Sequence, residues 1–133
     1  MADANAQTKR EHEVGTLAAP LLTFNLAQEL EGLRSEDRWQ SGHTAKTLAK
    51  YPDLRIVLIA MKAGGRLEKH HTEGRISVQT LEGRLRFSTA RQSVELSAGQ
   101  MLTLEQNIPH DVEALVDSAF LLTIAWPDTP AAK

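Results

Sequence analysis

Residues 65–83 read GRLEKHHTEGRISVQTLEG, and this stretch decides the fold. From Arg75 onwards it alternates polar and hydrophobic side chains, which is the pattern of a half-buried β-strand. Gly83 follows at a turn signal, after Glu82. The segment before the strand carries two adjacent histidines with acidic residues on both sides, so it holds candidate metal-ligating groups at a strand end.

Segments with the same two-residue period fill the rest of the chain from about residue 44. The dense run LRIVLIAM at 54–61 comes first, and turn signals such as Gly64-Gly65 and Ala98-Gly99 separate it and its successors. Many short strands with almost no helix between them predict an all-β sandwich or barrel. The expected strands are 54–61, 75–81, 84–88, 93–97, 101–105, 111–116 and 119–126.

One short helix is expected ahead of the strands, at residues 26–36. Asn25 is a good N-cap residue, and Gln28 stands three positions on, where a capping box has its second member. Leucines recur at helical spacing over this segment. Its expected role is to cover an open end or edge of the β-domain. With 133 residues, a single domain is expected over 17–127, between a flexible N-terminal tail at 1–16 and a C-terminal tail at 128–133.

Composition excludes several classes of function. The formal net charge is −2 with Lys and Arg scattered, so neither a nucleic acid nor an anionic membrane surface is expected as the main partner. The chain has no cysteine, which leaves His, Asp and Glu as metal ligands. No apolar run approaches the roughly 20 residues of a membrane span, and the first 15 residues lack the apolar segment of a signal peptide. A cytoplasmic location is therefore expected.

Two segments together resemble the paired sequence motifs of the cupins. They are GRLEKHHTEGRISVQTLEG at 65–83 and GQMLTLEQNIPHDV at 99–112, and the resemblance extends over roughly residues 54–126. It implies a small single-domain conserved barrel of the RmlC-like type. The fold class expected on this basis is all-β, a double-stranded β-helix or jelly-roll barrel with a short N-terminal helix.

The resemblance also indicates where a metal site would lie. The two histidines of the family's first motif correspond to Lys69 and His71, its glutamate to Ile76, and the histidine of its second motif to His110. Because only two of these four positions carry a ligand, the resemblance implies a degenerate metal site. A divalent ion would need His71, His110 and a further ligand from His70 or Glu73, and this donor set suits Zn, Fe, Ni or Mn.

Strand parity gives two alternatives for the histidine segment, because successive side chains of a strand face opposite sides. The register we favour puts Leu67, Lys69 and His71 in the barrel interior, since it buries a leucine and agrees with the family positions. The other register turns Arg66, Glu68 and His70 inward. A β-bulge at the two histidines would also bring His70 inside.

The sequence favours a cupin that binds a small molecule inside its barrel, with no catalytic residue assigned. The expected ligand-binding residues are Lys69, His71, Ile76, Val78 and His110. One alternative is a metal-dependent dioxygenase or isomerase that acts on a small organic acid. A second alternative is a structural or partner-binding barrel. In each case a homodimer is expected, because exposed sheet edges are commonly paired with a second copy.

Overall fold

The structure is a computed structural model that describes residues 17–127, so the two tails expected at 1–16 and 128–133 lie outside the described residues. Neither helix among residues 17–127 has the length and hydrophobicity of a transmembrane segment. In chain order the elements are α2 (Leu26–Arg34), the 3-10 helix η1 (Asp37–Ser41), β2 (His43–Tyr51), β3 (Leu54–Met61), β4 (Arg66–His70), β5 (Arg75–Glu82), β6 (Arg84–Thr89), β7 (Ser93–Ser97), β8 (Met101–Leu104), β9 (His110–Ala114) and β10 (Ser118–Ala125).

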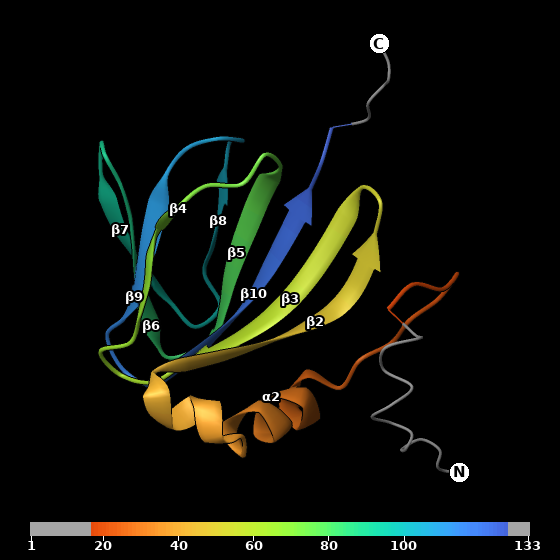
Figure 1. The fold of residues 1–133 in the computed structure, drawn as a ribbon. Helices are drawn as coiled ribbons and strands as arrows, with labels where there is room; N and C mark the ends of the chain where they lie inside the picture. The colour runs from red at the N-terminus through yellow and green to blue at the C-terminus, as the bar shows by residue number, and fades with distance from the viewer. Residues whose placement is uncertain (1–16, 128–133) are drawn as a thin grey trace.

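Two antiparallel sheets face each other, and helix α2 covers the outer side of one of them (Figure 1). The five-stranded sheet has the order β2-β3-β10-β5-β8, and the four-stranded sheet has the order β4-β9-β6-β7. The last strand, β10, pairs with both β3 and β5 in the middle of the larger sheet. Strands alternate between the two sheets along much of the chain, as in a jelly roll, so the predicted all-β architecture is confirmed.

The strands expected from the alternating pattern are all present, with ends that shift by at most two residues. Strand β2 was not among them. Its face towards the other sheet carries small or polar residues such as Ala45 and Thr47, and its other face carries Lys46, which pairs with Glu29 of helix α2 at 2.7 Å. An edge strand with this composition has little hydrophobic alternation to detect.

Helix α2 begins as expected, with the backbone N–H of Gln28 donating to Oδ1 of Asn25 at 3.2 Å. It ends at Arg34, two residues before the expected end. Leu30 and Leu33 are buried, and they belong to one hydrophobic cluster with Leu58 and Ala60 of β3. The predicted covering helix is therefore held to the outer face of the larger sheet by hydrophobic packing.

The alternation of β3 divides the hydrophobic residues into two layers. Ile59 and Met61 face the smaller sheet and belong to the cluster between the sheets. Leu58 and Ala60 face helix α2 instead. The residues that face the space between the two sheets are therefore the odd-numbered ones of β3 and their cross-strand partners.

Candidate functional site

Side chains on the inner face of the larger sheet form rows that cross all five strands, because directly paired residues project from the same face. One of these rows has cationic side chains on strands β2 and β3 and aliphatic side chains on β10, β5 and β8. The row is Lys50, Arg55, Ile124, Ile76 and Leu104. The adjacent row is Thr47, Val57, Leu122, Val78 and Leu102.

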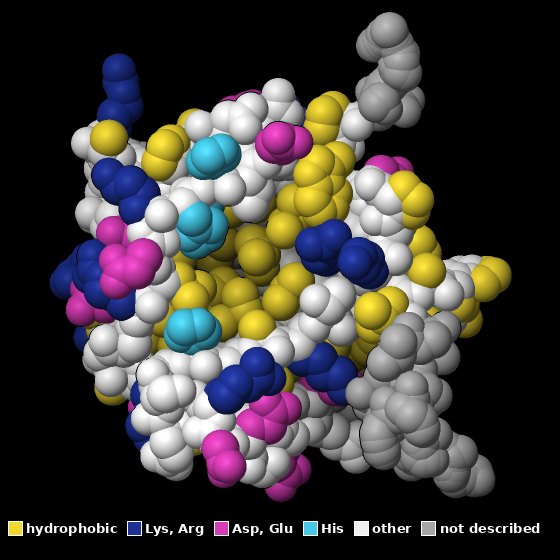
Figure 2. Space-filling model, in the orientation of Figure 1, with side chains coloured by type: hydrophobic (Ala, Val, Ile, Leu, Met, Phe, Trp, Pro, Cys, Tyr) yellow, Lys and Arg dark blue, Asp and Glu magenta, His cyan; other side chains and the backbone are white. Residues whose placement is uncertain are grey.

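A hollow lies between the two sheets (Figure 2). Several hydrophobic residues pack against the central cluster but stay only partly buried: Val57, Leu67, Leu102, Leu104, Leu122 and Trp126. Ile76 and Val78 belong to the same cluster and are buried, which agrees with their expected inward orientation. In the figure, histidine side chains lie along one side of this hollow and Lys and Arg side chains along the opposite side.

A β-bulge in strand β4 determines which histidine enters the site. Leu67 pairs with Val112, and His70 pairs with His110, so three steps along β4 correspond to two steps along β9. Residues three positions apart in a regular strand face opposite sides. Because of the extra residue, Leu67 and His70 instead lie on the same face of β4. The ring centroids of His70 and His110 lie 4.4 Å apart.

The pairing agrees with the register favoured from the sequence at Leu67, and beyond Leu67 the bulge places His70 rather than His71 opposite His110. Lys69, His70 and His71 are all exposed, at the end of β4 and just beyond it. Glu73 is also exposed, in the turn before β5. The structure brings His70 and His110 together, and the binding roles expected of Lys69, His71 and Glu73 stay predictions.

Backbone hydrogen bonds fix the protonation pattern of the two facing histidines. Nδ1 of His70 lies 2.7 Å from the carbonyl oxygen of Glu68, and Nδ1 of His110 lies 3.0 Å from that of Ile108. A carbonyl oxygen can only accept, so each Nδ1 carries the proton. In a neutral ring Nε2 is then a free acceptor, and it can accept a ligand's proton or hydrogen bond.

His110 is the more enclosed of the two rings. Its side chain is 4% exposed and stacks on Phe87, with ring centroids 5.0 Å apart and an interplanar angle of 15°. Burial lowers the pKa of His110 below its ordinary value, and the nearby His70 and His71 lower it further, against the opposing effects of the Ile108 carbonyl and Asp111. His110 is therefore held in its neutral form at neutral pH.

The donor set does not fit the metal site that the cupin resemblance implies. Over residues 17–127 no group of three or more His, Cys, Asp or Glu side chains converges in a way that could hold an ion. Two imidazoles are fewer than the three protein ligands of a catalytic zinc-type site. The side chain at the family's glutamate position, Ile76, has no donor atom and lies in the hydrophobic cluster. The described residues therefore do not form a binding site for Zn, Fe, Ni or Mn.

Three inward polar residues of the larger sheet were not recognised from the sequence. His43 pairs with Met61, and Lys50 pairs with Arg55, so all three polar side chains face the hollow side of the sheet. Their position depends on strand β2 and its irregular pairing between Thr47 and Ala49. The alternation within HTAKTLAKY is the sequence signal that could have predicted strand β2. The shift in the pairing of β2 with β3, which turns Lys50 inward, cannot be seen in a sequence.

No protein-family model and no curated protein matches this chain. Solved structures do match it. A conserved protein of unknown function from Streptococcus pyogenes shares 20% sequence identity at a TM-score of 0.68, with 86% of this chain and 95% of that chain covered. An RmlC-like cupin protein from Desulfovibrio desulfuricans shares 28% identity at a TM-score of 0.66, with 79% and 96% covered.

A mutant of salicylate 1,2-dioxygenase from Pseudoaminobacter salicylatoxidans shares 17% identity at a TM-score of 0.73, over 83% of this chain but 36% of that chain. An enzyme and a protein of unknown function thus share one barrel, so the fold does not specify a reaction. The strand pairing and these structures do specify the architecture. This chain has the jelly-roll fold of the cupin superfamily, as its two sequence motifs indicated.

Proposed function

We propose that this chain is a small-molecule-binding cupin whose ligand lies in the hollow between the two sheets. The observation that carries the proposal is the row of inward hydrophobic side chains that stay partly exposed, among them Val57, Leu122 and Trp126. Side chains commonly fill the interior of a small barrel. Apolar surface left open to water inside a concave site favours a ligand that displaces this water.

The histidine pair would orient the ligand in this hollow. Nε2 of His70 and Nε2 of His110 form no hydrogen bond with any described residue, and the His110 ring stacks on Phe87 of the hydrophobic cluster. Each Nε2 can accept a hydrogen bond from a hydroxyl or N–H group of the ligand. A few polar groups on an apolar wall are the usual means by which such sites select a ligand.

The alternative of a metal-dependent dioxygenase or isomerase has weaker support. It needs a third ligand beside His70 and His110, and the described residues offer none close enough. A purely structural barrel is disfavoured by the partly exposed interior, since a barrel without a ligand gains stability by filling its core.

The test is binding of the neutral fluorescent probe N-phenyl-1-naphthylamine, together with a thermal-shift screen of small organic molecules. Val57→Phe fills the hollow, and Gln79→Phe is the matched control because it adds the same ring at an exposed position of β5. We expect the wild-type and Gln79→Phe proteins to enhance the probe's fluorescence and Val57→Phe to lose most of this signal. Equal signals from all three proteins would contradict the proposal.

A further inference from the structure

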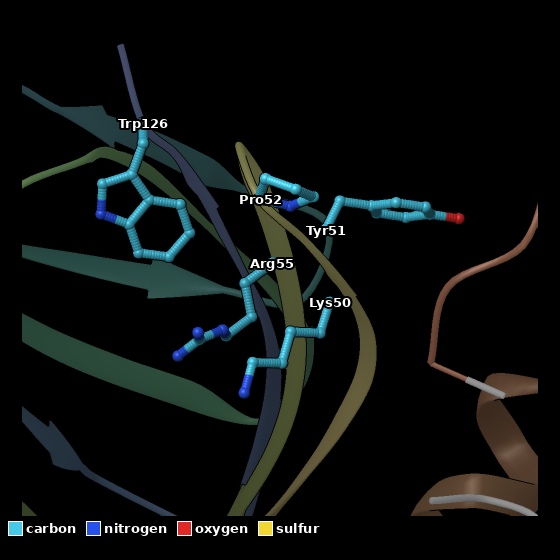
Figure 3. A pocket seen from close by; sticks show the side chains of 5 residues that line it. All are labelled: Lys50, Tyr51, Pro52, Arg55 and Trp126. Atoms are coloured by element: carbon cyan, nitrogen blue, oxygen red, sulfur yellow. The ribbon is translucent and has the colours of Figure 1, made fainter. Parts of the chain in front are cut away.

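An open pocket of about 440 Å³ lies at the end of the β2–β3 hairpin, where strand β10 leaves the sheet. It is lined by Lys50, Tyr51, Pro52, Arg55 and Trp126 (Figure 3). Pockets that hold small organic ligands begin at roughly 300 Å³. The size is thus sufficient for a small ring with one polar substituent.

The two cations of this pocket belong to the inner face of the sheet. Lys50 pairs directly with Arg55, which in turn pairs with Ile124 of the central cluster. Figure 3 shows both cationic side chains extending to the same side of the β2–β3 hairpin as Trp126. Tyr51 points to the opposite side, where its hydroxyl donates to the carbonyl oxygen of Ala19 at 2.7 Å. The pocket therefore continues the wall of the hollow between the sheets.

Neither cation of this pocket forms an ion pair with a carboxylate among residues 17–127, although Asp53 lies in the turn of the same hairpin. Most other described arginines pair with a carboxylate: Arg34, Arg38, Arg66, Arg75, Arg84 and Arg86. Arg55 and Lys50 form no such pair with a described residue, and Nε of Arg55 is buried without a hydrogen-bond partner. Two adjacent cations that lack acceptors favour an anion bound between them.

The chemistry of the three side chains defines the class of anion. The guanidinium carbon of Arg55 lies 5.2 Å from the centre of the Trp126 ring, which holds the planar fork in place without neutralising its charge. A guanidinium fork matches the two oxygens of a carboxylate, and Lys50 adds a point charge. The Trp126 ring and the adjacent hydrophobic row suit a planar hydrocarbon group.

We infer that the Lys50–Arg55–Trp126 pocket binds the carboxylate of a planar, aromatic organic acid whose ring lies towards the hollow. This inference rests on the proposed function, because it identifies the class of ligand that the hollow takes. It adds a specific anion site on the side of the hollow opposite to the histidine pair. The geometry thus separates a charged end of the ligand at Lys50 and Arg55 from a hydrogen-bonding end at His70 and His110.

Isothermal titration of the full chain with benzoate and with benzamide tests the inference, because the two differ mainly in charge. We expect benzoate to bind at least about tenfold more tightly, since hydrogen bonds to charged groups are the stronger ones. The variants are Lys50→Gln, Arg55→Gln and the double variant. Arg91→Gln is the control because Arg91 is an exposed arginine in the β6–β7 turn.

The double variant should lose about tenfold or more of the benzoate affinity while its benzamide affinity stays unchanged, and Arg91→Gln should match the wild type. The substitution Arg55→Gln could also disturb Trp126, so Lys50→Gln alone serves as a second test. Because Lys50 is exposed, this variant should weaken benzoate binding with no loss of thermal stability. Equal affinities for benzoate and benzamide, or a double variant with wild-type benzoate affinity, would overturn the inference. If the neutral probe still binds in that case, the proposed function stands without the anion site; if neither probe nor benzoate binds, both fail.

Discussion

His70 stands directly opposite His110 on strands β4 and β9, with ring centroids 4.4 Å apart and planes tilted by 59°. The pair exists because one additional residue in β4 reverses the parity after Leu67. Each ring is anchored through Nδ1 to a carbonyl oxygen two residues before it in the chain. Because the His110 ring is buried and faces a second imidazole, its pKa is lowered, and its protonation is therefore coupled to the stability of the fold.

The substitution His110→Gln should make stability less dependent on pH. Burial lowers the pKa of His110 below its ordinary value of 6.5, so the unfolded chain binds a proton more readily than the folded one as the pH falls. The wild-type protein therefore has its full stability above about pH 6.5 and loses stability as the pH falls towards the folded pKa, by at most about 1.4 kcal/mol per pH unit for one group. Urea unfolding at several pH values between 5 and 8 would measure the two slopes.

His43→Gln is the control for this experiment, because His43 is an exposed histidine of β2 that has no ring contact with the pair. We expect its pH slope to match that of the wild-type protein. If His110→Gln keeps the wild-type slope between pH 5 and 6.5, the stability of the fold is not linked to protonation of this ring.

Purified protein is expected to hold less than one equivalent of any divalent metal. His70 and His110 supply two imidazole ligands, and no third described His, Cys, Asp or Glu joins them. Elemental analysis after dialysis against Zn²⁺, Fe²⁺, Ni²⁺ and Mn²⁺ would measure the content, with a His70→Ala and His110→Ala double variant alongside. One tightly held ion per chain that disappears in the double variant would contradict the expectation and support the metal-dependent alternative.

The alternation of hydrophobic residues predicted an all-β sandwich or barrel, and the resemblance to the cupin motifs narrowed this to a jelly roll, whereas the site depended on features that no alternation contains. Ile76 and Val78 point inward as their strand pattern indicates. His70 enters the site only because of a bulge, and Lys50 reaches the inner face only after irregular pairing in β2. Bulges depend on how two strands meet, so a single strand's sequence does not reveal them.

The substitution Gly83→Ala should destabilise the fold more than Gly99→Ala. Both glycines have positive φ, 83° and 88°, so alanine costs roughly 1–2 kcal/mol at either position. A Cβ at Gly83 would also overlap Ser118 and the carbonyl oxygen of Asp117, whereas nothing lies within 4 Å of a Cβ at Gly99. Thermal unfolding of the two variants measures the difference, and equal losses would show that the β5–β6 turn relaxes without cost.

The substitution Leu33→Ala should loosen helix α2 from the larger sheet and lower the free energy of unfolding by roughly 2–5 kcal/mol. Leu33 is 2% exposed and packs in the cluster that joins the helix to β3, so its truncation leaves a cavity there. Leu21→Ala, at a residue that is 80% exposed, is the matched control and should change stability by less than about 0.5 kcal/mol. Because the two hydrophobic clusters lie on opposite faces of one sheet, probe binding in the hollow should survive Leu33→Ala while the protein stays folded. Loss of probe binding in a folded Leu33→Ala protein would mean that the helix also shapes the inner face.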